Sequence, residues 1–386
     1  HLRPFLPQPS DETGSKIEDL AHDLYEVVFQ QGGTISGEHG DGLARTAFVQ
    51  SQYGPLYRVF QFIKDLFDPQ RRLNPGKILG DDPHLIRRDF RPLPTIAAAD
   101  RPGPGLVSLG FSWTPEELAA AAGDCNGCGA CRTQSATQRM CPFFRINPSE
   151  HASPRAKANA IRALDGPVAF GALETEQLHQ LASLCFNCKQ CQLECPGHVN
   201  VPHLMVEAKA ARVDVDGLSR SDWTASRVHS LSAVGSVMPR AANWLMTQPP
   251  ARWFLEKLFG IHRERKLPLL ARRPFLRSLK RRWTTRPRPG SNPRPVVYFV
   301  DHFANYHDPE LAMSLVQVLE HNNIPVHVPR DQQPSGMTLV SAGDLSEARE
   351  LAEWNLRELG ELAREGHRII CTEPSAVVCL KQEYPE

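Results

Sequence analysis

Eight of the ten cysteines in this chain of 386 residues fall into two closely spaced groups. The first group has the pattern C-x2-C-x2-C-x9-C-P and consists of Cys125, Cys128, Cys131 and Cys141. The second has the pattern C-x2-C-x2-C-x3-C-P and consists of Cys185, Cys188, Cys191 and Cys195. A single tight loop with this spacing can bring three thiolates to three corners of a cube. The spacing, ending in a Cys-Pro step, is typical of a [4Fe-4S] cluster.

The fourth ligand of each cluster is expected to come from the other group. In two-cluster ferredoxins the cysteine before proline binds the other cluster, because the chain leaves its own loop as a helix. We therefore predict that Cys195 completes the cluster of Cys125, Cys128 and Cys131, and that Cys141 completes the cluster of Cys185, Cys188 and Cys191. Apolar residues at helical spacing in 149–166 and 173–184 predict the helices that this crossing needs.

The alternative for the cysteines is a pair of four-cysteine zinc sites without a redox role. Zinc sites usually combine two C-x2-C pairs, whereas runs of three cysteines followed by Cys-Pro have the iron-sulfur spacing. The spacing therefore favours two [4Fe-4S] clusters. Thiolates arranged in this way also favour a reducing compartment, and hence a cytoplasmic location.

A second chemical pattern is the glycine-rich stretch GGTISGEHGDGLAR, residues 32–45. Such a loop can approach a flat ring closely. On an extended backbone, Glu38 and His39 are expected to point to opposite sides. An imidazole with an ordinary pKa of about 6.5 is largely neutral at pH 7 and can accept a proton. Taken alone, the loop could equally be a solvated turn without chemistry.

Residues 1–80 resemble the end of the C-terminal substrate domain of FAD-linked oxidases, the group that contains D-lactate, glycolate and D-2-hydroxyglutarate dehydrogenases. The resemblance rests on the glycine-rich stretch, on IKDLFDPQRRLNPGKIL and on the initial HLRP. It implies a small 2-hydroxy acid substrate and FAD bound mainly by residues that precede this chain. It also implies that Glu38, His1 and an upstream histidine bind a divalent metal, Zn or Mn, and that His39 is the general base.

Two further residues are candidates for binding cofactor or substrate. The resemblance implies that Asn74, in the sequence NPGK, lies next to the flavin, although NPGK alone is an ordinary helix stop. Arg45 could pair with a carboxylate through two hydrogen bonds, or it could brace the loop. Nearby, a helix is expected from Ser15, as a possible cap, to the stop at Gly32 and Gly33.

The segment after the cysteines is predicted to be helical and basic, from 210 to a linker ending near 295. Its run HRERKLPLLARRPFLRSLKRRW, residues 262–283, interleaves apolar residues with arginines and lysines. This run could lie on an anionic membrane surface, or it could be a solvated face or tether broken by Pro268 and Pro274. The overall net charge of +1 gives no reason to expect nucleic acid.

Residues 296–386 alternate between strand and helix patterns, which predicts an α/β unit with parallel strands. The unit resembles the cysteine-rich (CCG) domain of heterodisulfide-reductase subunits and of the anaerobic glycerol-3-phosphate dehydrogenase C subunit, through YF, DPELA, VLE and EPSAVVCLKQEYP. It departs from that family in two places, because FVDHFANY has no cysteine and QQPSG, residues 332–336, replaces Cys-Cys-Gly. A third metal centre is therefore in doubt.

The sequence thus predicts a multidomain protein of α+β and α/β parts. The expected parts are the end of an oxidase domain (1–80), a linker (81–110), an α-helical two-[4Fe-4S] ferredoxin-like domain (111–209), a helical basic segment and linker (210–295) and a partial CCG-like domain (296–386). The chain starts without methionine and stops within a predicted helix, so we expect a fragment. The predicted activity is 2-hydroxy acid oxidation with electron transfer to a quinone or redox protein, and the alternative is a non-catalytic electron-transfer subunit.

Overall fold

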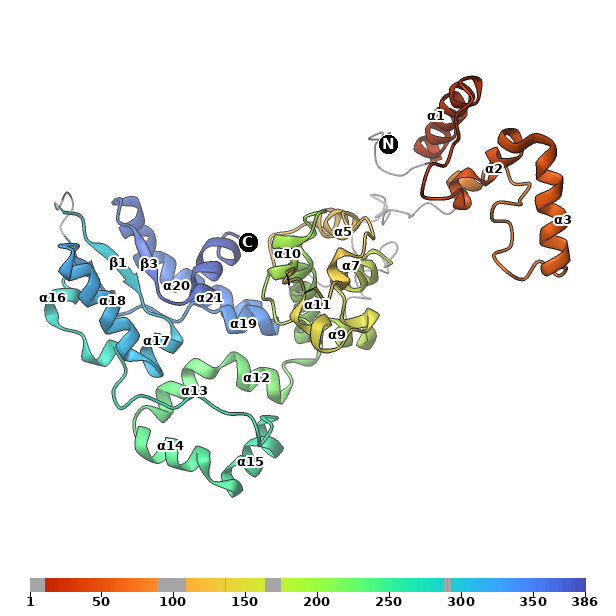
Figure 1. The fold of residues 1–386 in the computed structure, drawn as a ribbon. Coiled ribbons are helices and arrows are strands. Elements are labelled where there is room, and N and C mark those ends of the chain that lie inside the picture. The colour runs from red at the N-terminus through yellow and green to blue at the C-terminus, as the bar shows by residue number, and fades with distance from the viewer. Residues whose placement is uncertain (1–10, 89–108, 136, 164–174, 288–289, 291–292) are drawn as a thin grey trace. The chain divides into compact units, whose positions relative to one another are not determined.

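The computed structural model describes residues 11–88, 109–135, 137–163, 175–287, 290 and 293–386 (Figure 1). The chain divides into two compact units, residues 1–95 and 96–386. His1, the candidate metal ligand, lies outside the described residues.

Residues 11–88, the described part of the first unit, form four α-helices around a small apolar core. They are α1 (Asp11–Gln30), α2 (Gly42–Tyr53), α3 (Tyr57–Phe67) and α4 (Leu85–Arg88), with the short turn η1 (Gly54–Leu56) before α3. The core contains Ala21 of α1, Ile35 of the loop between α1 and α2, and Phe48 of α2. Helix α4 packs against α1 and α2, so this unit extends beyond the predicted boundary at residue 80.

The predicted start of the first helix is wrong. Helix α1 begins at Asp11, so Ser15 lies inside the helix and does not cap it. The Ser15 hydroxyl instead accepts a hydrogen bond from Arg87 Nη1 at 3.0 Å, which ties α4 to α1. The predicted stop is confirmed, because the helix ends at Gln30 and Gly32 adopts a positive φ of 68°.

The cysteine-rich part of the second unit is built from short helices around one long central helix. The helices are α5 (Pro115–Gly123), α6 (Pro142–Ile146), α7 (Pro154–Arg162), α9 (Glu176–Ser183), α10 (Gln190–Glu194) and α11 (Val201–Asp216), with single turns η2 (Ala130–Arg132) and η3 (Glu150–Ala152). Helix α11 contacts α5, α7, α9 and α10, and its residues 201–208 are all buried. Because residues 201–208 of α11 are buried on every side of the helix, this half of α11 serves as the core of this part.

The basic segment forms four helices followed by an irregular stretch. The helices are α12 (Arg220–Ser226), α13 (Val228–Gly235), α14 (Pro239–Thr247) and α15 (Pro249–Phe259), and the irregular stretch leads through η5 (Leu276–Ser278) to α16 (Arg281–Thr284). Proline occupies the first turn of α14 and of α15, where its missing N–H costs no hydrogen bond.

The C-terminal part contains a three-stranded parallel sheet in the order β2-β1-β3. Its elements are β1 (Val296–Phe299), α17 (His302–Tyr306), α18 (Pro309–His321), β2 (Val326–His327), α19 (Met337–Ala342), α20 (Leu345–Arg364), β3 (Ile369–Cys371), α21 (Pro374–Val378) and η6 (Cys379–Glu383). Alternate residues of β1 face opposite sides: Tyr298 packs with residues of α18, and Val297 and Phe299 pack with residues of α20. The predicted parallel α/β arrangement is confirmed, whereas the CCG-like resemblance stays a prediction.

Candidate functional site

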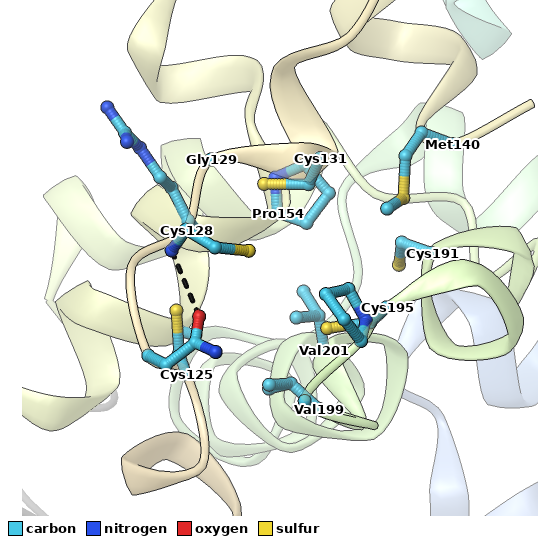
Figure 2. Close-up of a pocket in the computed structure, with 15 residues that line it drawn as sticks. Cys125, Cys128, Gly129, Cys131, Met140, Pro154, Cys191, Cys195, Val199 and Val201 are labelled. Atoms are coloured by element: carbon cyan, nitrogen blue, oxygen red, sulfur yellow. Dashed lines mark hydrogen bonds between the residues drawn. The ribbon is translucent and has the colours of Figure 1, made fainter. Parts of the chain in front are cut away.

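The first three cysteines line a hollow together with a cysteine of the second group. Cys125, Cys128 and Cys131 lie on one side of this first hollow and Cys195 lies across from them, as Figure 2 shows. Pro154, Val199 and Val201 add apolar side chains to its lining. The sulfur atoms therefore surround a small, mostly apolar space.

The second hollow repeats this arrangement with the roles of the groups exchanged. It is lined by Cys185, Cys188 and Cys191 together with Cys141, the cysteine before proline in the first group. Cys191 lines both hollows, so the two spaces are immediate neighbours. The grouping of the eight side chains in space is the one that the crossed assignment requires.

The two cysteine loops share one backbone conformation. Gly127 and Gly129 have φ values of 74° and 76°, and the equivalent residues of the second loop, Asn187 and Lys189, have φ values of 57° and 58°. A positive φ costs glycine little but is uncommon for a lysine. In the first loop the glycines in the sequence indicate the positive φ values. In the second loop the sequence gives no such indication, because Asn187 and Lys189 occupy these positions.

The thiols of these loops are in surroundings that disfavour their ionisation without a bound cation. Burial raises the pKa of Cys131, Cys188 and Cys191, and the nearby thiols add to the effect. A metal centre reverses this balance, because a coordinated thiol loses its proton. Two sets of four thiols, each around a small apolar space, fit the donor requirement of an iron-sulfur cluster.

Two lysines bring positive charge close to the second hollow. Lys157 is 1% exposed, and its ammonium donates to the carbonyl oxygens of Ala152 and Leu184 at 3.2 and 2.9 Å. Lys209 donates to the carbonyl of Cys185 at 2.6 Å and to that of Ser341 at 2.8 Å. Positive charge near a cluster favours the form that has gained an electron.

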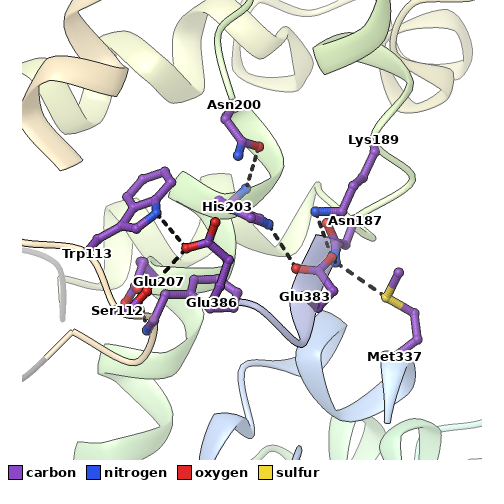
Figure 3. A network of polar contacts seen from close by, with 11 residues as sticks. Ser112, Trp113, Asn187, Lys189, Asn200, His203, Glu207, Met337, Glu383 and Glu386 are labelled. Carbon is purple, nitrogen blue, oxygen red and sulfur yellow. Dashed lines mark hydrogen bonds and ion pairs between the residues drawn. The ribbon is translucent and has the colours of Figure 1, made fainter. Parts of the chain in front are cut away.

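A buried polar network ties the second cysteine loop to the C-terminal part (Figure 3). Glu383, at the end of η6, pairs with Lys189 at 2.6 Å and with His203 Nε2 at 2.8 Å, and it accepts a hydrogen bond from Asn187 at 3.2 Å. Burial alone would raise the pKa of Glu383, but the hydrogen bond from His203 and the charge of Lys189 outweigh it and lower the pKa. Sequence reasoning missed this network, because no local pattern links residues so far apart in the chain.

In the first unit, Glu38 and His39 lie on the bend between α1 and α2. The expectation that they point to opposite sides is wrong, since Glu38 Oε1 and His39 Nε2 are 3.1 Å apart. The reason is that the loop is bent and not extended, with positive φ values at Gly40 and Gly42. Both side chains are exposed, at 64% for Glu38 and 71% for His39. Their interaction holds a carboxylate and an imidazole together at the surface of this unit.

The remaining candidates have local structural roles in the described residues. Arg45 Nη1 donates to the carbonyl of Gly40 at 2.6 Å, so this arginine braces the glycine-rich loop. Asn74 has a positive φ of 46°, and its carbonyl accepts from Lys77 N at 3.3 Å. Upstream of this turn, Asp68 accepts from the backbone of Arg72 and Leu73. Within the described residues, no group of three His, Cys, Asp or Glu side chains converges closely enough to hold one metal ion, and the cysteines around each hollow surround a wider space than a single ion occupies.

Two family models match separate parts of the chain. Residues 1–78 match the model of the C-terminal domain of FAD linked oxidases, and residues 124–200 match a 4Fe-4S dicluster domain. The predicted resemblance of the first part to FAD-linked oxidases is confirmed, and so is the iron-sulfur domain that the cysteine spacing predicted. The oxidase match includes Glu38, His39 and Asn74, and the dicluster match includes all eight clustered cysteines.

Curated relatives combine these two parts in one longer protein. D-2-hydroxyglutarate dehydrogenase of Escherichia coli is 24% identical over an alignment that covers 100% of this chain and 41% of that protein. The enzyme of the same name from Pseudomonas putida is 23% identical with the same coverage. D-lactate dehydrogenase of Anaerostipes hadrus is 41% identical, but the alignment covers only 14% of this chain and 12% of that protein. The chain thus spans about two fifths of the first two relatives.

No solved structure matches the chain with significance. Among the helices that the structure describes, none combines the length and the apolar character needed to cross a membrane.

Proposed function

We propose that this chain is the C-terminal part of a flavin and iron-sulfur oxidoreductase that oxidises a D-2-hydroxy acid. D-2-hydroxyglutarate, D-lactate and glycolate are the candidate substrates. Two electrons leave the substrate at an FAD bound mainly outside this chain, and they pass one at a time through two [4Fe-4S] clusters to an acceptor. The observation that carries the proposal is that each hollow is lined by the three closely spaced cysteines of one group and by the Cys-Pro cysteine of the other group.

The cluster ligands follow from this grouping. Cys125, Cys128, Cys131 and Cys195 hold the first cluster, and Cys185, Cys188, Cys191 and Cys141 hold the second. The clusters supply one-electron transfer when bound. The chain would keep the clusters close together, since Cys191 lines both hollows. Arg155 lines the first hollow and Lys157 the second, so a positive side chain beside each cluster would favour its reduced form.

At the flavin end, His39 is the proposed general base and Glu38 a proposed ligand of a divalent metal, with His1 and an upstream histidine. The metal would polarise the substrate hydroxyl, and His39 would accept its proton. The contact between Glu38 and His39 supports this division of roles, because a ligand and a base must act on neighbouring atoms of one substrate. Asn74 is proposed to lie beside the flavin, and Arg45 supports the loop from behind.

The alternative is an electron-transfer subunit whose first unit keeps its fold but has no chemistry. The retained pair of Glu38 and His39, inside a segment that matches the oxidase family, favours the catalytic proposal.

We also propose that the basic segment contacts a membrane surface. Residues 227–286 contain fourteen Lys or Arg but only two acidic residues. The same region exposes large apolar side chains at Leu231, Val234, Val237, Met238, Trp244, Leu245, Trp253, Phe254, Leu258 and Leu269. Exposed apolar and aromatic residues combined with positive charge are typical of helices that lie on anionic lipid.

Measurement of iron and sulfide content, and substitution of single cysteine ligands, test the proposed electron path. Anaerobically purified full-length protein should contain about eight irons and eight sulfides per chain. Cys195→Ser should damage the cluster of the first hollow, and Cys141→Ser that of the second, which electron paramagnetic resonance can distinguish after partial reduction. Cys371→Ser, outside both hollows, is the control. Stoichiometric zinc, or loss of the local cluster in each variant, would contradict the proposal.

A further inference from the structure

An inner cavity of about 500 Å³ lies at the carboxyl ends of the three parallel strands. Asp301 follows β1, Ser335 follows β2 and Glu373 follows β3, and all three line the cavity. In the order β2-β1-β3, the next two strands of the chain lie on opposite sides of β1, which makes the carboxyl end of β1 a topological switch point. Ligands of open parallel sheets bind at such points.

The opposite wall of the inner cavity belongs to the second cysteine loop. Cys185 and Phe186 line the cavity, and Cys185 also lines the second hollow. A cluster held in the second hollow would therefore be separated from the cavity by little more than one side chain. Lys209, which bonds to the Cys185 carbonyl, lines the same wall and adds positive charge to it.

A second, outer cavity of about 700 Å³ adjoins the inner one. The two cavities share Asp222, Ala225 and Val228, at the junction of α12 and α13. The outer cavity is walled mainly by apolar side chains, among them Leu231, Leu255, Phe259, Ile261 and Leu270. Both volumes lie within the range of about 300–1,000 Å³ that is usual for small-molecule sites.

Two histidines of the inner cavity carry buried nitrogens without a partner. Nδ1 of His229 and Nδ1 of His302 have no hydrogen-bond partner among the described residues. Burial, with the neighbouring imidazoles, lowers the pKa of His302 to about 3, so this ring is neutral at pH 7. A buried polar atom without a partner is costly, and a ligand that bonds to it removes the cost.

The hydrogen bonds of His307 determine which nitrogen of His302 is free to accept. His307 Nδ1 lies 3.0 Å from the carbonyl of Leu269, which can only accept, so Nδ1 carries the proton. In a neutral ring, His307 Nε2 is then the acceptor, and His302 Nε2, at 3.0 Å, must donate to it. Neutral His302 is left with a bare Nδ1, an acceptor suited to a hydroxyl group.

We propose that the two cavities bind a lipid-soluble quinone, with its ring in the inner cavity and its apolar chain in the outer cavity. This inference rests on the proposed electron path through the second cluster. The quinone gains two electrons, delivered singly from that cluster, and two protons from solvent, and it leaves as the hydroquinone. The electrons come from the C–H and O–H bonds of the hydroxy acid, which becomes a 2-oxo acid.

The shape of the site favours a quinone over a redox protein. A protein acceptor docks on an exposed surface, whereas Cys185 faces a concave space that continues into an apolar one. The isoprenoid or alkyl chain of either form can fill the outer cavity. The oxygens of the oxidised ring only accept hydrogen bonds, whereas the hydroquinone hydroxyl would donate to His302 Nδ1, so this nitrogen would hold the reduced form.

The test is anaerobic reoxidation of reduced clusters in the full-length protein. Clusters reduced with dithionite, after removal of the excess, are mixed with decylubiquinone or with its tail-less ring, dimethoxymethylbenzoquinone, and their visible absorbance is followed. We expect decylubiquinone to reoxidise the clusters at a much lower concentration than the tail-less ring. Equal rates with both quinones, or reoxidation only by a soluble redox protein, would overturn the proposal.

Variants locate the site. Val228→Trp narrows the junction between the two cavities, so decylubiquinone should no longer reoxidise the clusters at a lower concentration than the tail-less ring. Val318→Trp, on the exposed side of α18, should keep this difference between the two quinones. His302→Ala should weaken binding of the reduced form, decylubiquinol, about tenfold, the effect of one lost hydrogen bond. His302→Asn, which can still accept, should recover part of the binding, and exposed His321→Ala is the control. Binding of decylubiquinol is measured independently by quenching of tryptophan fluorescence. Affinities equal to that of the wild type in both Val228→Trp and His302→Ala would overturn the proposal.

The design separates this inference from the proposed function. A hydroxy acid is first added to the oxidised protein in the absence of any quinone. A fall in the visible absorbance of the clusters, which is called bleaching here, tests the electron path from substrate to clusters alone. If the hydroxy acid bleaches the clusters but no quinone reoxidises them, the path stands and the quinone site is wrong. If only dithionite reduces the clusters and decylubiquinone reoxidises them, the quinone site stands and the substrate proposal is wrong.

Discussion

At the scale of single residues, the pair of Glu38 and His39 has the clearest chemical consequence. The two side chains are 3.1 Å apart and largely exposed in the first unit. An exposed contact between a carboxylate and an imidazole contributes little to stability. The pair is therefore hard to explain by folding alone, and a role in binding and proton transfer gives each side chain a separate purpose.

Replacing each member of the pair should produce a different kinetic defect in the full-length protein. His39→Ala should lower kcat by about 10²–10⁴-fold, the usual contribution of a general base, with FAD and clusters retained. Glu38→Ala should lower the content of bound divalent metal and raise KM as well, because the metal would also orient the substrate carboxylate. Steady-state kinetics with D-2-hydroxyglutarate, D-lactate and glycolate, read beside metal content, measure both effects.

The controls for this prediction lie in the same unit. His84 pairs with Glu18 at 2.7 Å and is also exposed, so His84→Ala removes a comparable surface histidine. Glu26→Ala removes an exposed glutamate of α1. Turnover at the wild-type level in His39→Ala on the best substrate would show that the loop is a solvated turn, and that the chemistry of this chain lies in its cysteines.

At the scale of elements, the second cysteine loop is held by a helix from the far end of the chain. Glu383 of η6 contacts both Lys189, in its left-handed conformation, and His203 of α11. All three side chains are almost fully buried. Removing one member of a buried ion pair leaves an unpaired charge in a poorly solvated place, which usually costs about 3–5 kcal/mol.

Glu383→Gln should therefore lower the unfolding temperature of the second unit, on the order of 5–10 °C at pH 7. The contribution of Glu383 to the stability of the wild-type protein also depends on pH. The folded pKa of Glu383 lies below its ordinary value of 4.5, so its contribution is present above pH 4.5 and is lost as the pH falls through the folded pKa. Thermal unfolding measured from pH 7 down to pH 3 should show a weaker acid dependence in Glu383→Gln than in the wild type. Exposed Glu353→Gln, on α20, should behave like the wild type, and parallel curves for all three proteins would contradict this role.

The parts of the site that sequence predicted are those that depend on local spacing. Cysteine spacing is set by the tight turn around each hollow, so the crossed grouping could be predicted, and strand patterns predicted the parallel sheet. The bend that joins Glu38 to His39 depends on the φ values of Gly40 and Gly42, which no pattern reports. The pairing of Glu383 with Lys189 is a tertiary contact between distant segments, and the two adjoining cavities likewise arise only from packing.

At the scale of the whole molecule, the second unit combines a cluster site, two adjoining cavities and a basic, apolar surface in one stretch of chain. The helices α13, α14 and α15 that wall the outer cavity also expose Trp244, Leu245 and Leu258. A quinone with an apolar chain is dissolved in the membrane, so a protein that reduces it must reach the lipid surface. The basic residues around these helices would provide the attraction, at about 1 kcal/mol for each charge near an anionic surface.

The second unit should therefore bring the full-length protein to vesicles that contain anionic lipid. In a flotation assay, binding should fall steeply as salt is raised, because a Debye length of about 10 Å at 0.1 M screens the attraction. The double variant Leu245→Ser and Leu258→Ser should bind much less, since each change removes an apolar side chain that could enter the lipid. The double variant Val318→Ser and Leu356→Ser removes equally exposed residues from α18 and α20, away from the basic segment, and should bind like the wild type. Equal binding of all three proteins, or equal binding to neutral and anionic vesicles, would show that these helices meet no membrane, and a quinone would then have to reach the outer cavity from solution.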